Sequence, residues 1–311
     1  MGILSAIKNE DDMAETTQPV EMIKQIGIIG AGHMGSGIAQ VASLAGYKVI
    51  LVDVSKEKTE AALATISGNI ARQVSKDTMT QDQQQAALDL ISITSDINQL
   101  SEADLVVEAI TEDEDLKQEI YKDLCPVLKP ETILCSNTST ISITRLAAKT
   151  DRPAKFIGMH FMNPVPVMEL VELIRGIATE EETYQTCKAF VKSLEKYTAV
   201  SEDFPAFIVH RIMIPMINEA IYTLYEGVGT VEAIDTAMCY GAHHPMGPLE
   251  LADFIGLDNC LGIMQKLYEG LADPKYRPCP LLVKYVEAGW TGQKAGRGFY
   301  DYRDGTPVPT R

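Results

Sequence analysis

The stretch that decides the fold is KQIGIIGAGHMGSGIAQVASLAGYKVILVD, which runs from Lys24 to Asp53. Within it, Ile26 to Ile29 is a short apolar run typical of a buried parallel strand. A GxGxxG pattern follows from Gly30 to Gly35, and a second apolar run, Lys48 to Val52, closes the stretch before its terminal acid. Strand, glycine-rich turn, helix, strand and acid in this order predict a dinucleotide-binding unit.

Each glycine of the pattern has a separate mechanical role. Gly30 permits the tight turn, Gly32 lets the backbone approach a pyrophosphate, and Gly35 allows close packing of helix and strand. The unpaired N–H groups at the helix start bind the phosphates. A glycine-rich surface turn is the simpler alternative for such a pattern alone. The residues that we expect to contact the cofactor here are Gly30, Ala31, Gly32, His33, Met34 and Gly35.

The acid at the end of the second strand indicates which dinucleotide is bound. Asp53 is placed to accept hydrogen bonds from the hydroxyls of the adenosine ribose, whereas its charge repels a 2′-phosphate. We therefore expect NAD rather than NADP as the cofactor.

Composition limits the remaining function classes. The chain has 311 residues and is 46% hydrophobic, which suits about two globular domains. No apolar run reaches the roughly 18 residues needed to cross a bilayer, so no membrane segment is expected. The formal net charge of −16 argues against nucleic acid as a partner. The six cysteines show no CxxC pair and no metal-ligand spacing, which favours reduced thiols in a cytoplasmic enzyme and no metal.

Helical and strand-like segments alternate along the first two thirds of the chain. This order predicts an α/β fold with a Rossmann-type, doubly wound sheet extending to about residue 200. Strands then give way to amphipathic helical patterns, and Pro205 falls at the change. We therefore expect an N-terminal extension (1–22), an NAD-binding domain (23–204) and an all-helical C-terminal domain (205–311) for substrate binding and dimerisation. The expected strands after Asp53 are ISITS (91–95), Asp104 to Ala109, Thr132 to Cys135 and Phe156 to His160; the expected helices are Ser55 to Val74, Gln81 to Leu90, Leu116 to Leu128, Ile208 to Gly227 and Thr230 to Tyr240.

A histidine and a glutamate twelve residues apart are the best candidates for chemistry. Hydride transfer from a secondary alcohol requires a base for the hydroxyl proton, and histidine, with a pKa near ~6.5, suits this role. His160 follows the apolar segment KFIGM, so it is expected at the carboxyl edge of the sheet. Glu172 interrupts the apolar run MELVELI, and an imidazolium across a hairpin would compensate its charge. The alternative is a structural histidine and an edge-strand surface charge.

Four motifs together resemble those of the short-chain 3-hydroxyacyl-CoA dehydrogenases. Within that family, the resemblance is strongest to the bacterial 3-hydroxybutyryl-CoA dehydrogenases. The resemblance covers nearly everything from Ile23 to Tyr302. The motifs are NTSTIS (137–142), GMHFMNPVPVMELVELI (158–174), AHHPMGPLELADFIGLD (242–258) and GxKxGxGFYDY (292–302).

The resemblance implies roles for particular residues. The catalytic histidine of the family falls on His160, its partner glutamate on Glu172, and the serine that bonds the substrate oxygen on Ser139. Asn69 and Lys76 fall on positions that bind coenzyme A. The further cofactor contacts that it implies are Glu112, Lys117, Asn137, Asn163 and Lys294. Without the resemblance, several of these would pass for ordinary surface or turn residues.

One position departs from the family. Where members show asparagine in F(I/V)VNR, this chain reads FIVHR, with His210 at a position implied to bind substrate. A bulkier, titratable ring there is expected to affect substrate orientation and chain-length preference.

The sequence therefore predicts a cytoplasmic, homodimeric, NAD-dependent (S)-3-hydroxyacyl-CoA dehydrogenase that acts between acetoacetyl-CoA and 3-hydroxybutyryl-CoA. One alternative is a dehydrogenase for a free hydroxy acid or sugar acid on the same scaffold. Another is a dinucleotide-binding dimer whose catalysis is impaired through His210.

Overall fold

The computed structural model describes residues 22–310, and the chain divides into two compact units between Asp203 and Phe204. The N-terminal extension expected from the sequence lies, apart from Met22, outside the described residues. No helix among residues 22–310 is both long and apolar enough to cross a membrane.

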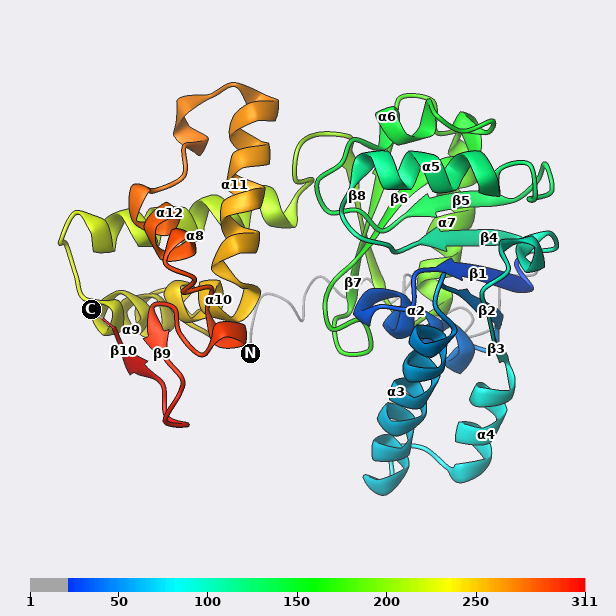
Figure 1. Cartoon of the computed structure of the whole chain (residues 1–311), viewed down its shortest axis with the longest axis horizontal. Helices are drawn as coiled ribbons and strands as arrows, with labels where there is room; N and C mark the ends of the chain where they lie inside the picture. Colours follow the sequence, from blue (N-terminus) through cyan, green and yellow to red (C-terminus); the bar gives the residue numbers. More distant parts are fainter. Residues whose placement is uncertain (1–21, 311) are drawn as a thin grey trace. The chain divides into compact units, whose positions relative to one another are not determined.

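The first unit is built on a single eight-stranded sheet, and the prediction of a doubly wound α/β fold is confirmed (Figure 1). Neighbouring strands are parallel except for β6 and β7, which pair antiparallel. In spatial order the strands are β3 (Ile91–Thr94), β2 (Lys48–Val52), β1 (Gln25–Ile29), β4 (Leu105–Glu108), β5 (Ile133–Ser136), β6 (Phe156–Phe161), β7 (Leu170–Arg175) and β8 (Tyr197–Glu202).

Polar residues just before the helices of this unit explain where several of them begin. The Ser55 hydroxyl accepts a hydrogen bond from the third residue of α3, and Thr80 and Gln83 form a capping box at α4. Helices α3 and α4 run together and project beyond the sheet (Figure 1). The helices are α2 (His33–Leu44), α3 (Lys56–Ser75), α4 (Gln81–Asp89), α5 (Glu114–Leu124), α6 (Ile143–Ala147) and α7 (Glu181–Ser193), with short 3-10 turns at Ile97–Leu100 and Pro153–Lys155.

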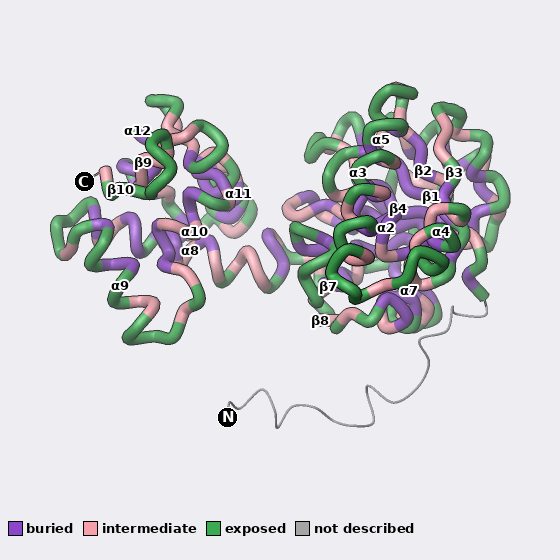
Figure 2. The backbone as a smooth tube through the Cα atoms, turned by 90° about the horizontal axis from the view of Figure 1, so that it is seen from below, coloured by how far each residue is buried: buried purple, intermediate pink, exposed green. Residues whose placement is uncertain are grey.

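The core of the first unit lies between the sheet and its helices, where the buried segments of Figure 2 gather. All residues of β4 and β5 are buried, as expected for central parallel strands covered on both faces. Tyr47 packs edge-on against Phe190 of α7, with ring centroids 5.3 Å apart. Burial of each large apolar side chain contributes about 1.5–3 kcal/mol, so this packing stabilises the sheet that carries the site.

The second unit is helical and has its own apolar core, so the predicted fold class is confirmed here as well. It also contains a short antiparallel pair of strands, β9 (Tyr300–Asp301) and β10 (Val308–Pro309), which the expectation of an all-helical domain missed. Strands of two residues are too short to show a period in the sequence. The helices are α8 (Val209–Tyr225), α9 (Val231–Gly241), α10 (Pro248–Ile255), α11 (Leu257–Leu271) and α12 (Pro280–Glu287), with 3-10 turns at Pro274–Tyr276 and Gln293–Ala295.

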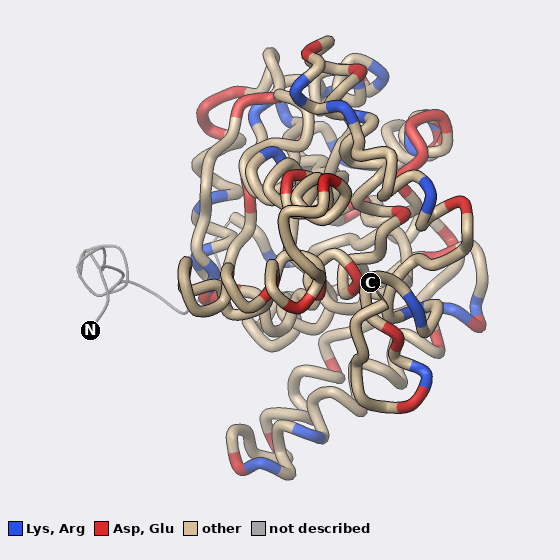
Figure 3. Tube along the Cα trace, turned by 90° about the vertical axis from the view of Figure 1, so that its left-hand side faces the viewer, with Lys and Arg blue, Asp and Glu red and all other residues tan. Residues whose placement is uncertain are grey.

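Charged residues of both signs are interspersed along the chain, as Figure 3 shows. Acids exceed bases by 43 to 27 in the whole sequence. An anionic ligand therefore needs a local arrangement of amide groups and cations, which the first unit supplies.

Candidate active site

The turn between β1 and α2 has the geometry that a phosphate-binding turn requires. Gly30 has φ +104°, and a Cβ added there would lie 2.6 Å from the carbonyl oxygen of Ala109. A Cβ on Gly35 would lie 1.7 Å from the carbonyl oxygen of Gly30, so only glycine allows this contact between turn and helix. A Cβ on Gly32, in contrast, would meet no atom within 4 Å. The side of the turn at Gly32 is open to a ligand.

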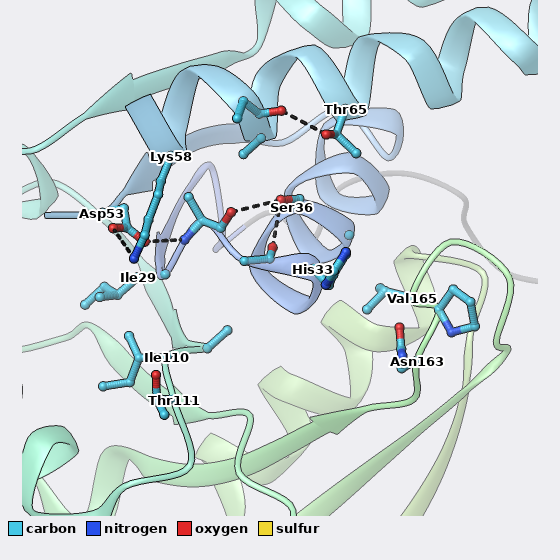
Figure 4. A pocket seen from close by; sticks show the side chains of 18 of the residues that line it. Ile29, His33, Ser36, Asp53, Lys58, Thr65, Ile110, Thr111, Asn163 and Val165 are labelled. Atoms are coloured by element: carbon cyan, nitrogen blue, oxygen red, sulfur yellow. Dashed lines mark hydrogen bonds and ion pairs between the residues drawn. The ribbon is translucent and has the colours of Figure 1, made fainter. Parts of the chain in front are cut away.

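A cavity of about 670 Å³ lies against this turn (Figure 4). Gly32 precedes the first residue of α2 and carries no side chain to cap the helix, so the first N–H groups of α2 remain available to an anion. Ile29, Asp53, Ile110 and Asn163 contribute to the walls. Size, apolar walls and amide groups together fit a dinucleotide.

Asp53 lies at the wall of this cavity and is held by backbone groups. Its Oδ2 accepts a hydrogen bond from the Ala31 N–H at 2.9 Å, and its Oδ1 accepts one from Ser55 at 3.3 Å. Lys58 Nζ lies 3.9 Å from the same Oδ1 (Figure 4). The carboxylate thus anchors the glycine-rich turn as well as facing the cavity.

His160 and Glu172 lie opposite each other on the antiparallel strands β6 and β7. His160 Nδ1 is 2.8 Å from Glu172 Oε2, and the two side chains are 7% and 0% exposed. His160 lies within β6 rather than beyond its end, and Glu172 is not an edge-strand surface charge, because β8 covers the outer side of β7. Pairing with the histidine compensates the charge of this buried carboxylate.

The loop that contains Ser139 is organised by one carboxylate. Glu112 Oε1 accepts hydrogen bonds from the hydroxyl of Thr138 at 2.7 Å, from the backbone N–H of Ser139 at 3.0 Å and from that of Thr140 at 2.9 Å. Its partial burial acts to raise the pKa of Glu112, but these bonds and the charge of Lys117 outweigh it and hold the pKa below its ordinary value. The Ser139 hydroxyl also donates to this oxygen, at 3.3 Å.

Lys117 is not an ordinary surface residue, because its side chain is 1% exposed. Its Nζ lies 2.5 Å from Glu108, which is fully buried and also accepts hydrogen bonds from the hydroxyls of Tyr121 and Ser136. The Ile110 N–H donates to the same carboxylate at 2.8 Å. Sequence reasoning missed this cluster around Glu108, whose members are spread over 28 residues and are brought together only by the fold.

Two predicted asparagines take different positions. The Asn137 side-chain oxygen accepts a hydrogen bond from the Phe161 N–H at 2.9 Å, which ties the loop after β5 to the end of β6. Asn163 precedes a cis proline and lines the cavity. Both follow the carboxyl end of a strand, Asn137 after β5 and Asn163 after β6, and so lie at the same edge of the sheet as the glycine-rich turn and His160.

A second, smaller cavity of about 310 Å³ adjoins the first along α3. Asn69 lines both cavities, while Arg72 and Lys76 line the second. Arg72 donates a hydrogen bond to Asn69 at 2.8 Å. The predicted residues Asn69 and Lys76 are therefore brought together, and Arg72 adds a second cation that sequence reasoning did not single out.

Two predicted residues belong to the second unit. His210 lies in the first turn of α8 and is half-buried, after two residues, Ala206 and Phe207, that have positive φ. Lys294 Nζ is paired with Asp258 at 2.6 Å.

The structure does not bring all predicted residues to one cavity wall. The predicted residues that line the two cavities, among those the structure describes, are Gly30 to His33 of the turn, Asp53, Asn69, Lys76 and Asn163. The lining does not include His160, Glu172 or Ser139. The glycine-rich turn, the strand-end acid and the buried histidine–carboxylate pair on one sheet define a dinucleotide-binding oxidoreductase.

Comparison with known proteins specifies the family. The family models for the NAD-binding and C-terminal domains of 3-hydroxyacyl-CoA dehydrogenase match residues 25–204 and 207–302. A 3-hydroxybutyryl-CoA dehydrogenase of Bradyrhizobium diazoefficiens is 66% identical over 93% of this chain and 99% of that protein. A crystal structure of (S)-3-hydroxybutyryl-CoA dehydrogenase from Ralstonia eutropha is similar with a TM-score of 0.89, at 46% identity, over 90% of this chain and 99% of that one. The chain belongs to the 3-hydroxyacyl-CoA dehydrogenase family and is a dehydrogenase that uses a nicotinamide dinucleotide.

Proposed function

We propose that this enzyme catalyses the reversible, NADH-dependent reduction of acetoacetyl-CoA to (S)-3-hydroxybutyryl-CoA. The observation that carries the proposal is the buried pair of His160 and Glu172, 2.8 Å apart on adjacent strands. The names of the two similar proteins reported above support the thioester and its short acyl chain.

His160 serves as the proton donor to the ketone oxygen in reduction and as the base for the 3-hydroxyl in oxidation. Its Nδ1 is engaged by Glu172, so Nε2 is the nitrogen that exchanges the substrate proton. Glu172 fixes the ring and compensates the imidazolium charge. Ser139 donates a hydrogen bond to the same substrate oxygen, and Glu112 sets the position of its loop. The bound cofactor supplies or receives the hydride at the substrate carbon.

NAD(H) is the preferred cofactor because Asp53 faces the cavity at the end of β2. We assign the residues from Gly30 to Gly35, which include Ala31, His33 and Met34, to the pyrophosphate, which the first N–H groups of α2 bind. Lys117 and Asn137 act through the residues they hold, Glu108 and the end of β6. Asn163 contacts the cofactor at the cavity wall, and Lys294 is a further cofactor contact that the resemblance implies.

Coenzyme A binds along the second cavity. Arg72 lies in the last turn of α3 and Lys76 directly follows that helix, so the two offer positive charges to its phosphates, while Asn69 contributes an amide. In the second unit, His210 contacts the acyl thioester in place of the expected asparagine.

The remaining expectations concern the setting of the enzyme. We propose a domain boundary at residues 204–205, with the second unit forming a homodimer through exposed apolar side chains such as Ile212 and Tyr240, which are 67% and 86% exposed. All six cysteines are free, which supports a reducing compartment, the cytoplasm.

Initial rates of NADH oxidation with acetoacetyl-CoA, free acetoacetate and NADPH test this function. The fastest turnover is expected with the thioester and NADH. Lys76→Ala should raise the KM for acetoacetyl-CoA by about tenfold and leave that for NADH unchanged, whereas Lys56→Ala, an exposed lysine at the start of the same helix, should change neither. Turnover of free acetoacetate at the same rate would contradict the thioester assignment.

The His210→Asn variant distinguishes the proposed dehydrogenase from a dinucleotide-binding protein with impaired catalysis. If the parent is an active dehydrogenase, we expect the variant to differ little from it in turnover rate. Absence of turnover in the parent with NADH binding intact, and recovery in the variant, would instead favour a binding protein whose catalysis is impaired at this position.

A further inference from the structure

One face of helix α3 lines the cofactor cavity. The residues on that face recur at intervals of three and four, which is the spacing of a single helical face. They are Lys58, Ala61, Ala62, Thr65 and Asn69. Small, neutral side chains occupy the middle of the face, so Lys58 in the first turn is the residue that brings charge to this wall.

Lys58 stands beside the one acid of the cavity. Of the described residues that line it, Asp53 carries the single carboxylate and Lys58 the single ammonium group. Lys58 Nζ lies 3.9 Å from Asp53 Oδ1, and the two side chains are 65% and 12% exposed (Figure 4). Each oxygen of Asp53 already accepts a backbone N–H, from Ala31 and from Ser55, which holds the carboxylate in place. Lys58, in contrast, is exposed and can turn toward a ligand.

The two charges have opposite effects on the 2′-phosphate that distinguishes NADPH from NADH. An acid at the end of the second strand accepts hydrogen bonds from ribose hydroxyls and repels a 2′-phosphate, whereas a nearby cation accommodates that phosphate. A phosphate monoester carries a charge of about −1.5 to −2 at neutral pH, so it is attracted by an ammonium group far more than a neutral hydroxyl is.

We infer that Lys58 is a specificity-determining residue for the cofactor, which supplies a positive charge to the 2′-phosphate of NADPH and so limits the rejection of NADPH by Asp53. The inference rests on the proposed position of the adenosine ribose at Asp53. The enzyme prefers NADH but also binds NADPH measurably, and the ratio between the two depends on Lys58.

Equilibrium binding of NADH and of NADPH to the full-length protein, followed by the change in nicotinamide fluorescence, tests this. Lys58→Ala should weaken NADPH binding by about tenfold and NADH binding by less than twofold. Lys58→Glu should weaken NADPH binding further. Lys56→Ala is the matched control, because Lys56 lies in the same turn, is 78% exposed, pairs with Glu60 and does not line the cavity.

The NADPH-specific loss should shrink as salt is added, since charges this exposed are screened over about 10 Å at 0.1 M. An unchanged NADPH-to-NADH ratio in Lys58→Ala would overturn the inference. An equal loss of affinity for both cofactors would also overturn it, because Lys58 would then contact a group that NADH and NADPH share. Failure of the parent protein to bind NADPH at all would overturn it as well. No acyl substrate is present in this measurement, so its outcome is independent of whether the thioester assignment is right.

Discussion

Replacement of Glu172 by glutamine tests whether the buried pair acts in the chemistry. Glutamine has the shape of glutamate and retains a carbonyl oxygen, but it removes the negative charge next to His160. Because Glu172 is fully buried on β7 and faces His160 Nδ1 at 2.8 Å, little water is present to screen the change.

The size of the effect follows from this geometry. Opposite unit charges about 4 Å apart gain about 4 kcal/mol at an effective dielectric constant near 20. A hydrogen bond from Nδ1–H to the glutamine oxygen recovers about 1 kcal/mol. The imidazolium that forms in oxidation therefore loses about 3 kcal/mol of stabilisation, which lowers kcat by about a hundredfold.

Steady-state kinetics with NAD and 3-hydroxybutyryl-CoA, alongside equilibrium binding of NADH, would measure this. We expect NADH binding to change by less than twofold, because Glu172 does not line the cofactor cavity. Glu169→Gln, an exposed acid just before the same strand, is the control and should behave as the parent. A kcat within threefold of the parent value, with unchanged thermal unfolding, would refute a catalytic role for the pair.

Three further predictions concern residues around this pair and elsewhere in the chain. Glu112→Gln removes the negative charge of the acceptor that holds the Ser139 loop and so weakens the hydrogen bonds that it accepts. The kcat should therefore fall by about tenfold with NADH affinity nearly unchanged; a parental kcat would contradict this. Gly35→Ala should abolish dinucleotide binding, because the new Cβ would lie 1.7 Å from the carbonyl oxygen of Gly30. In Gly68→Ala, within α3, the new Cβ would meet nothing within 4 Å, so urea titrations should show a free energy of unfolding raised by about 0.5–1 kcal/mol. Burial raises the pKa of Asp253 from 3.8 to about 6, so the folded state binds more protons and this group's contribution to stability is lost as the pH rises through about 6. The stability difference between parent and Asp253→Asn should shrink by about 2 kcal/mol from pH 4 to pH 7, and a constant or growing difference would contradict this prediction.

The elements of the fold that the sequence predicted are those with a strong local signal. The apolar runs before Gly30 and before Asp53 became β1 and β2, because an uninterrupted apolar run suits a strand buried on both faces. The helix expected over 116–128 instead spans Glu114–Leu124: Asp113 caps its start, and Pro126 follows its end.

The contacts of the site were less predictable because they depend on register and on distant pairing. The proximity of His160 and Glu172 could be inferred, since two polar residues in apolar runs on either side of a turn face the same way when the register allows. Nothing local distinguishes Lys117 from the charged residues around it in the sequence, and only the fold places its ammonium group against Glu108.

Glu108 and Glu172 show how one sheet uses buried carboxylates in two ways. Both are 0% exposed, and a carboxylate taken out of water costs several kcal/mol unless it is compensated. Glu108 is compensated by a lysine, two hydroxyls and the N–H of Ile110, none of which is suited to exchange a proton near neutral pH; burial raises the pKa of the Tyr121 hydroxyl further. It therefore fixes the backbone at Ile110, which lines the cofactor cavity. Glu172 faces a histidine, the side chain whose charge changes most readily at physiological pH. The identity of the partner, rather than the burial of the carboxylate, thus separates a structural anchor from the proposed proton-transfer site in this sheet.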